Sequence, residues 1–242
     1  MFISKELLIN TAEKYKVTLD DVAVERFDVY AQLLVEWNKV MNLTGITEPD
    51  EIVVKHFADS LTFLTYVDVP EGASLIDVGT GAGFPGVPLM IARPDLKVTL
   101  LDSTKKRLNF LSEVSRETNL ETEIVHARAE DAGKTAEYRE SFDFATARAV
   151  TNLRDLSEYC LPFVKKGGHF VPMKSAKAEE EIAGAKKAIH ILGGQIEEKH
   201  SFDLEDAGNR TIIKIKKISQ TPTNQINQGK LSTKRRKVSA WI

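Results

Sequence analysis

A glycine-rich turn is the part of this sequence whose residue types are best suited to chemistry. It contains three glycines spaced two residues apart, Gly79, Gly81 and Gly83. An apolar run at 75–78, which includes Asp77, precedes the turn, and a second apolar run at 86–92 follows it. This order predicts a strand, a tight turn and a helix, because glycine reaches backbone angles closed to other residues and lets a ligand approach the backbone. Ligands of open α/β sheets bind at the carboxyl ends of strands, so the turn predicts a site for a nucleoside-containing cofactor.

Three interpretations of the turn remain open at this point. The dinucleotide pattern G-x-G-x-x-G fits only from Gly81, two residues beyond the apolar run, and Pro85 inside it has no N–H to offer a pyrophosphate. Counted from Gly79, with an acid just upstream, the turn resembles the first motif of S-adenosylmethionine-dependent methyltransferases, whose cationic cofactor favours a nearby carboxylate. A glycine-rich turn without any ligand is the third interpretation.

Two acids follow the next apolar runs along the chain. Asp102 ends the run at 98–101, where a carboxylate can accept hydrogen bonds from ribose hydroxyls; it or Ser103 could also cap the following helix. Glu130 comes shortly after the run at 124–125, where it could accept the exocyclic amine of an adenine or be a solvated loop residue. Together with the glycine turn these acids favour a nucleoside ligand, although neither identifies it.

The run at 142–147 leads into Arg148 and lacks the motifs of several kinds of methyl-transfer site. It has no Asn/Asp-Pro-Pro-aromatic motif to hold an exocyclic amine, and no Pro-Cys nucleophile of the kind used at pyrimidine C5. These absences favour an acceptor with no proton to lose, such as guanine N7, so no catalytic general base is expected. Arg148 could orient guanine O6 or a phosphate, or it could form a structural ion pair with a carboxylate.

Apolar runs and helical segments alternate from residue 74 onward. Strands are expected at 75–78, 98–101, 124–125, 142–147 and 169–172. Helices are expected at 86–92, 105–118, 152–161 and 178–192. Such alternation predicts an α/β fold with a doubly wound, mostly parallel sheet. Two more strands at 195–202 and 211–215, with no helix between them, predict an antiparallel hairpin at the edge of a seven-stranded sheet.

Three segments are expected along the chain: an N-terminal helical extension at 1–70 packed on the core, a class I methyltransferase domain at 71–218, and a basic tail at 219–242. In the extension, apolar residues repeat at helical spacing over 20–41, with Thr18 as the expected cap, and Pro49 opens a second helix. The extension holds six Lys/Arg and twelve Asp/Glu, whereas the tail holds five Lys/Arg and no acid. Such a tail either binds phosphates or is a solvated end.

Bulk composition excludes several classes of protein. The formal net charge of −2 excludes a polycation, and no apolar run approaches the length of a membrane span. The first residues show no signal-peptide pattern, and the one cysteine, Cys160, excludes an internal disulfide, so a cytoplasmic location is expected. Cys160 is expected to be a small buried residue, and no metal site is expected.

Four motifs occur together in this sequence. They are Asn42-Leu43-Thr44-Gly45-Ile46-Thr47, Lys55-His56-Phe57-Ala58-Asp59-Ser60-Leu61, the acid and glycine turn from Asp77 to Gly86, and Thr146-Ala147-Arg148-Ala149-Val150. They resemble the bacterial small-subunit ribosomal RNA methyltransferase G family, also called glucose-inhibited division protein B, over most of residues 20–218. The resemblance implies a Rossmann-like enzyme that uses S-adenosylmethionine to methylate N7 of one guanine, position 527 in rRNA nomenclature, of 16S rRNA in the small ribosomal subunit or its precursor.

The resemblance also implies roles for particular residues. Cofactor contacts would fall on Gly79, Phe84, Ala129, Glu130 and Arg148. Lys174 and Arg210 would face RNA. The tail departs from the family pattern, because no basic Tyr/Phe-Pro-Arg segment follows Thr221-Pro222. A small-molecule or protein methyltransferase and a nucleotide-binding protein of similar fold are the remaining alternatives.

Overall fold

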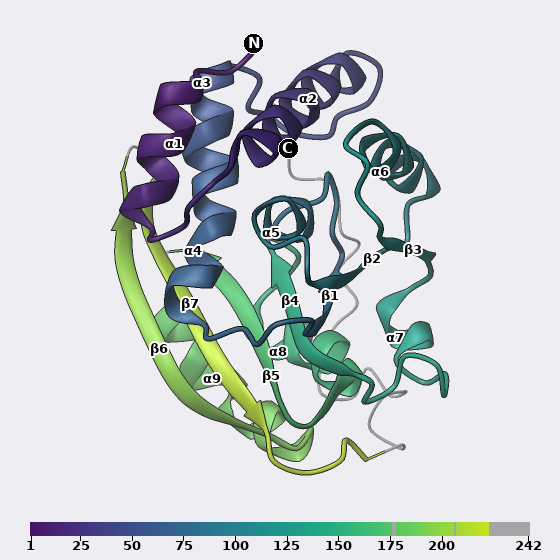
Figure 1. Cartoon of the computed structure of the whole chain (residues 1–242). Coiled ribbons are helices and arrows are strands. Elements are labelled where there is room, and N and C mark those ends of the chain that lie inside the picture. The colour runs from purple at the N-terminus through teal and green to yellow at the C-terminus, as the bar shows by residue number, and fades with distance from the viewer. Residues whose placement is uncertain (176–177, 206, 223–242) are drawn as a thin grey trace.

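A seven-stranded sheet forms the centre of the computed structural model, which describes residues 1–175, 178–205 and 207–222 (Figure 1). The strands are β1 (Ser74–Val78), β2 (Lys97–Asp102), β3 (Glu123–His126), β4 (Phe142–Arg148), β5 (Val164–Ser175), β6 (Gly194–Leu204) and β7 (Gly208–Lys217). Their order in the sheet is β3-β2-β1-β4-β5-β7-β6. Strand β7 runs antiparallel to both of its neighbours, β5 and β6, and the other pairs of described strands are parallel. The predicted doubly wound, mostly parallel sheet is therefore confirmed, and its antiparallel strand lies one place in from the edge.

Helices cover both faces of the sheet, because alternate residues of a strand point to opposite sides. One face packs against α1 (Lys5–Lys14), α2 (Asp21–Asn38), α4 (Asp59–Tyr66), α5 (Gly86–Ala92) and α6 (Lys105–Glu117). The other face packs against α7 (Ala129–Ala132), α8 (Leu153–Cys160), the 3₁₀ turn η2 (Leu161–Phe163) and α9 (Ala178–Ile191). On β1, Leu75 belongs to the first core and Ile76 to the second. Cys160 lies fully buried in the second core, as expected.

The ends of two helices differ from those that the sequence predicts. The side chain of Asp20 caps α2 by accepting a hydrogen bond from the Ala23 N–H at 2.7 Å, so the expectation of Thr18 as the cap is wrong. Helix α6 has Thr104 at its N-cap position with no side-chain cap bond. Asp102 therefore does not cap α6 directly; its Oδ1 accepts the Thr104 N–H at 2.7 Å.

A π-helix interrupts the second helical segment of the N-terminal extension. Pro49 opens α3 (Pro49–Ile52) as predicted, because proline fits the first helical turn. The chain then continues as the π-helix η1 (Val53–Ala58) before α4 begins at Asp59. No sequence pattern predicts this π-helix, and such segments are often found at functional sites.

Strand β5 is longer than the predicted run at 169–172. It begins at Val164 and passes through Gly167 and Gly168, which precede the predicted run. A Cβ atom on Gly168 would lie 2.5 Å from the carbonyl oxygen of Asp143 on β4. Glycine is therefore required there, because the two strands approach too closely for a side chain.

Aromatic side chains join the N-terminal helices to the sheet domain. Phe27 and Tyr30 of α2 pack against Phe57 and Phe84, with ring centroids 4.8 Å apart for Phe27–Phe57 and 5.5 Å apart for Tyr30–Phe84. The ring centroid of Tyr30 also lies 6.3 Å from that of Phe110 on α6. Helix α2 thus lies beside the glycine turn and shares one core with the sheet. The division of the chain at residue 70 stays a prediction, and the basic residues of the tail at 230–237 lie outside the described residues.

Candidate active site

The glycine turn joins the end of β1 to the end of β2. The N–H groups of Gly79 and Thr80 both donate to the carbonyl oxygen of Leu101, at 2.8 and 3.1 Å. The three glycines have positive φ angles of 70°, 61° and 100° at Gly79, Gly81 and Gly83. This is the left-handed region that favours glycine, so the residue type at each position follows from the path of the backbone.

Asp77 supports the turn from inside the sheet. Its Oδ2 accepts the Thr80 hydroxyl at 2.7 Å and the Gly86 N–H at 2.9 Å, which fixes the start of α5. Its Oδ1 is buried and has no hydrogen-bond partner among the described residues. Burial raises the pKa of Asp77 to about 6, although the bonds from Thr80 and Gly86 oppose that shift. A buried carboxylate oxygen that lacks a donor marks this edge as a place for a polar or cationic ligand.

Asp102 lies next to the turn, at the end of β2. Its Oδ2 accepts the Gly81 N–H at 3.0 Å, and the Arg107 guanidinium lies 3.7 Å from the same oxygen. Asp102 is only 3% exposed. The carboxylate therefore couples the glycine turn to the loop that begins α6, and its remaining lone pairs are available to a ligand.

Ala129 and Glu130 begin α7, just after β3. His126 of β3 pairs in register with Asp102 of β2, so the loop that leads to α7 starts beside Asp102. The Glu130 side chain is 42% exposed and lies 3.8 Å from the Arg128 guanidinium. The structure thus brings the ends of β1, β2 and β3 to one edge of the sheet, and the contact of Glu130 with an adenine stays a prediction.

Phe84 lies between two polar side chains at the same edge. The ring of His56 stacks on it with centroids 4.4 Å apart, and the Arg148 guanidinium carbon lies 4.7 Å from its centroid. His56 comes from η1 and Arg148 from the end of β4. Phe84 is 6% exposed and packs on Tyr30 as well, so in this structure it is both a core residue and a support for Arg148.

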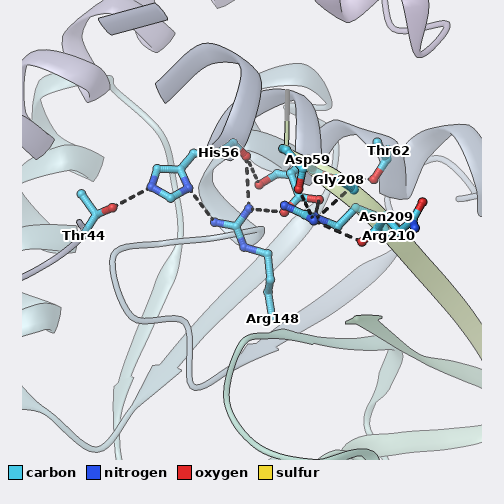
Figure 2. A network of polar contacts seen from close by, with 10 residues as sticks. Thr44, His56, Asp59, Thr62, Arg148, Gly208, Asn209 and Arg210 are labelled. Carbon is cyan, nitrogen blue, oxygen red and sulfur yellow. Dashed lines mark hydrogen bonds and ion pairs between the residues drawn. The ribbon is translucent and has the colours of Figure 1, made fainter. Parts of the chain in front are cut away.

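Arg148 forms the ion pair that the sequence left open as an alternative. Its Nη1 lies 2.8 Å from Oδ2 of Asp59, the first residue of α4 (Figure 2). Its Nη2 lies 3.4 Å from Nδ1 of His56, and only 13% of its side chain is exposed. Arg210 of β7 contacts the other oxygen of Asp59, with Nε 3.1 Å from Oδ1.

Lys174, at the end of β5, also pairs within the protein. Its Nζ lies 2.7 Å from Glu181 of α9 and donates to the Thr151 carbonyl oxygen at 2.7 Å, with 9% of the side chain exposed. Lys174 and Arg210 both lie at the edge of the sheet where β4 ends, but each is paired with a carboxylate. Their contact with RNA stays a prediction.

Tyr30 and Asp59 are two residues of the site that were not singled out from the sequence. The Tyr30 hydroxyl donates to the Ala82 carbonyl oxygen at 2.5 Å, and a Cβ atom on Gly83 would lie 2.9 Å from that hydroxyl. Tyr30 belongs to the apolar stripe of α2, and such a stripe predicts a buried core residue rather than a residue of a site. Asp59 stands in the second of the four motifs, which was the only signal for it.

His56 is held in its neutral form. Burial, together with the charge of Arg148, lowers the pKa of His56 to about 3. Arg148 donates toward Nδ1, and the Thr44 hydroxyl lies 2.7 Å from Nε2. The ring therefore accepts at Nδ1 and carries its proton at Nε2, and it supports Phe84 and Arg148 as a structural residue.

The lowered pKa of His56 predicts a loss of stability in acid. The folded protein resists protonation of this ring between pH 6.5 and 3, so its contribution to stability is complete above pH 6.5 and declines as the pH falls. In His56→Gln this decline should be absent. Between pH 7 and 4.5 the free energy of unfolding should fall by about 2.5 kcal/mol less in the variant than in the parent. Urea unfolding at several pH values measures it, and parallel curves would contradict the assignment.

One hollow among the described residues lies away from the glycine turn. A hollow of about 630 Å³ lies between the turn after α1, the end of α4 and β7, and includes Val17, Tyr66 and Lys214; none of its lining residues belongs to the glycine turn. No group of three or more His, Cys, Asp or Glu in the described part could hold a metal ion. Within the same residues, no helix combines the length and apolarity needed to cross a membrane.

Solved structures with the same fold include enzymes of different chemistry. An S-adenosylmethionine-dependent methyltransferase from Aquifex aeolicus has a TM-score of 0.51 at 16% identity, with 68% of this chain and 92% of that one covered. A variant of the branched-chain polyamine synthase from Thermus thermophilus has a TM-score of 0.56 at 13% identity, with 79% and 64% covered. These similarities show the fold alone. With the strand order and the strand-end site, they define a class I, Rossmann-like methyltransferase fold.

Sequence comparison then identifies the family. The profile described as rRNA small subunit methyltransferase G matches residues 23–212. Proteins named ribosomal RNA small subunit methyltransferase G from Brevibacillus brevis and Staphylococcus aureus are each 48% identical to this chain. The match covers 91% of this chain and 93% of the first relative, and 90% and 91% for the second. The chain therefore belongs to the rRNA small subunit methyltransferase G family.

Proposed function

We propose that this protein uses S-adenosylmethionine to methylate N7 of one guanine of 16S rRNA, position 527 in rRNA nomenclature. The observation that carries the proposal is the convergence of the glycine turn, Asp102 and the start of α7 at one edge of the sheet in a chain of this family. The small ribosomal subunit or its precursor is the expected partner, and a cytoplasmic location stays a prediction from the single cysteine.

The residues at this edge fit the proposed cofactor. The three glycines adopt positive φ angles and have no side chains, so a nucleoside can approach the backbone of the turn closely. The Oδ1 atom of Asp77, which has no hydrogen-bond partner among the described residues, favours a cationic or amino group nearby. Asp102 would hold the ribose, and Ala129 with Glu130 would hold the adenine. Phe84 and Arg148, together with Gly79, Gly81 and Gly83, would complete the site. When bound, S-adenosylmethionine supplies a methyl group activated by a positively charged sulfur.

The chain's own groups then have to orient the acceptor rather than activate it. Guanine N7 accepts a methyl group through its lone pair and loses no proton, so no residue has to act as a general base. His56 is neutral and already bonded on both ring nitrogens, which agrees with that expectation. Arg148 presents a planar guanidinium at the end of β4, which suits guanine O6 or a phosphate. Catalysis would rest on alignment and on exclusion of water from the site.

Methyl transfer to RNA tests the proposal directly. With tritiated S-adenosylmethionine, we expect label in 16S rRNA, supplied either as isolated 30S subunits or as naked RNA. Asp102→Ala should lower incorporation at least 100-fold, because it removes the acceptor of the Gly81 N–H and of the ribose. Label in protein or small molecules but not in RNA would favour the alternative methyltransferase classes and refute the rRNA assignment.

Asp95 offers a matched control for that variant. It stands just before β2, at the opposite end of the strand from Asp102, and its Oδ2 accepts the Gly72 N–H at 3.0 Å, the same distance as in the Asp102–Gly81 bond. Asp95→Ala therefore removes a carboxylate that accepts a glycine N–H at the far edge of the sheet. It should leave the specific activity of the folded protein within about twofold of the parent. An equal loss in both variants would show a structural effect only.

A further inference from the structure

One buried carboxylate, that of Asp59, connects two arginines that are far apart in the sequence. Oδ2 lies 2.8 Å from Nη1 of Arg148, and Oδ1 lies 3.1 Å from Nε of Arg210 (Figure 2). Arg148 ends β4, whereas Arg210 lies near the start of β7, where it pairs in register with Ser175 of β5. Asp59 is 5% exposed, so both bonds form in a largely dry environment, where they are stronger than at the surface.

Asp59 makes the closest polar contact of Arg148. The other two, with the carbonyl oxygen and the Nδ1 atom of His56, are both 3.4 Å long. The Phe84 ring limits the guanidinium on one side without fixing its rotation. An arginine side chain loses conformational entropy when it is held still, so a single strong partner decides whether it is preorganised. In this site that partner is Asp59.

Two of the three guanidinium nitrogens of Arg210, Nε and Nη1, form bonds within the described part of the protein. Its Nε bonds Asp59, and its Nη1 donates to the carbonyl oxygens of Ala207 at 2.6 Å and Asn209 at 3.2 Å. These bonds tie the turn before β7 to the Asp59 carboxylate. Arg210 thereby holds Asp59 on the side opposite Arg148, and this arrangement suits a supporting role better than contact with RNA.

We propose that Asp59 is a positioning residue for methyl transfer, and that Arg210 serves the reaction through Asp59 rather than by binding RNA. The inference rests on the proposed function, because it assigns Arg148 to the acceptor side of that reaction. Asp59 holds the Arg148 guanidinium at the edge of the sheet that carries the glycine turn. Arg210 in turn fixes the position of the Asp59 carboxylate. Loss of either residue should slow the reaction step of bound RNA and leave RNA affinity nearly unchanged.

A double-mutant cycle tests this arrangement. We expect Asp59→Asn and Arg210→Gln each to lower kcat about tenfold, with KM for RNA changed less than threefold. The double variant should be no more than about twofold slower than Asp59→Asn alone, because Arg210 acts through the carboxylate that is already absent. If Arg210 contacts RNA directly, its substitution will raise KM in both backgrounds, and the inference is overturned.

Asp28 provides the matched control. It is a buried carboxylate of α2, 7% exposed, which accepts the N–H groups of Phe2 and Ile3 at 2.6 and 2.8 Å. Asp28→Asn should lower the melting temperature by an amount similar to Asp59→Asn while kcat stays within twofold. A tenfold loss of kcat in Asp28→Asn as well would reduce Asp59 to a stability role.

Two further outcomes keep the test decisive. If Asp59→Asn does not fold, Arg210→Gln alone decides: a lower kcat at constant KM supports the inference, and a higher KM at constant kcat overturns it. If the unmodified protein transfers no methyl group to RNA, the proposed function fails. If it does transfer the group and the two substitutions act independently, only the role of Asp59 fails.

Discussion

Gly79→Val is expected to raise the dissociation constant for S-adenosylhomocysteine at least 100-fold. Gly79 has φ +70°, which a β-branched residue rarely adopts, and a Cβ atom there would lie 3.0 Å from Cγ2 of Val150. Valine would therefore displace the backbone that the cofactor is proposed to contact, and would add methyl groups in the same space. Isothermal titration calorimetry measures the change, and a 100-fold loss corresponds to about 2.7 kcal/mol of binding free energy.

Gly72→Val separates this effect from backbone strain. Gly72 has almost the same angle, φ +69°, but no atom lies within 4 Å of a Cβ atom built on it, and it stands before β1 at the far edge of the sheet. Both variants should lose stability, since both place valine in the left-handed region, and Gly79→Val should lose more because of its contact with Val150. Only Gly79→Val should lose affinity for the nucleoside. Unchanged affinity in Gly79→Val would remove the glycine turn from the proposed site.

Arg148→Lys should lower methyl transfer to RNA roughly 10- to 100-fold. Lysine keeps the positive charge beside Asp59 but has no planar fork to lie over Phe84 or to make two parallel bonds with an acceptor. Alanine is a less informative substitution, because removing one partner of a buried ion pair costs about 3–5 kcal/mol by itself. Single-turnover rates with saturating RNA measure the reaction step directly.

Arg93→Lys is the control for that substitution. Arg93 also forms an ion pair, with Nε 2.7 Å from Oδ1 of Asp95, but it follows α5 and lies away from the strand ends that form the site. It should lose less stability, because this ion pair is more exposed than that of Arg148, and it should keep the parent's single-turnover rate. If Arg148→Lys retained the full rate as well, the guanidinium of Arg148 would have a structural role only.

Local signals in the sequence were enough to predict which strand ends meet at one edge of the sheet. Each parallel strand is an apolar run followed by a polar or glycine residue, and such a run reports burial on both faces without knowledge of the tertiary fold. The positions of Gly79 and Asp102 follow from these runs, and the structure joins them through the Gly81–Asp102 hydrogen bond.

The partners of the cations could not be predicted in the same way. Arg148 and Arg210 pair with Asp59, which is 89 and 151 residues away in the sequence, and Lys174 pairs with Glu181 of α9. Periodicity reports which face of an element is buried, but not which distant carboxylate a long side chain meets. The π-helix η1 was missed because no local pattern in its residues, Val53–Ala58, distinguishes it from an α-helix.

The position of the methyl group on the RNA is the most direct test of the whole account. RNA methylated by the protein is reduced with borohydride and treated with aniline, which cleaves the chain at N7-methylguanosine, and the ends are mapped by primer extension. We predict a single cleavage site, at position 527 of 16S rRNA, that is absent after reaction with Asp102→Ala. Incorporated label that resists cleavage, or cleavage at many guanines, would contradict the account.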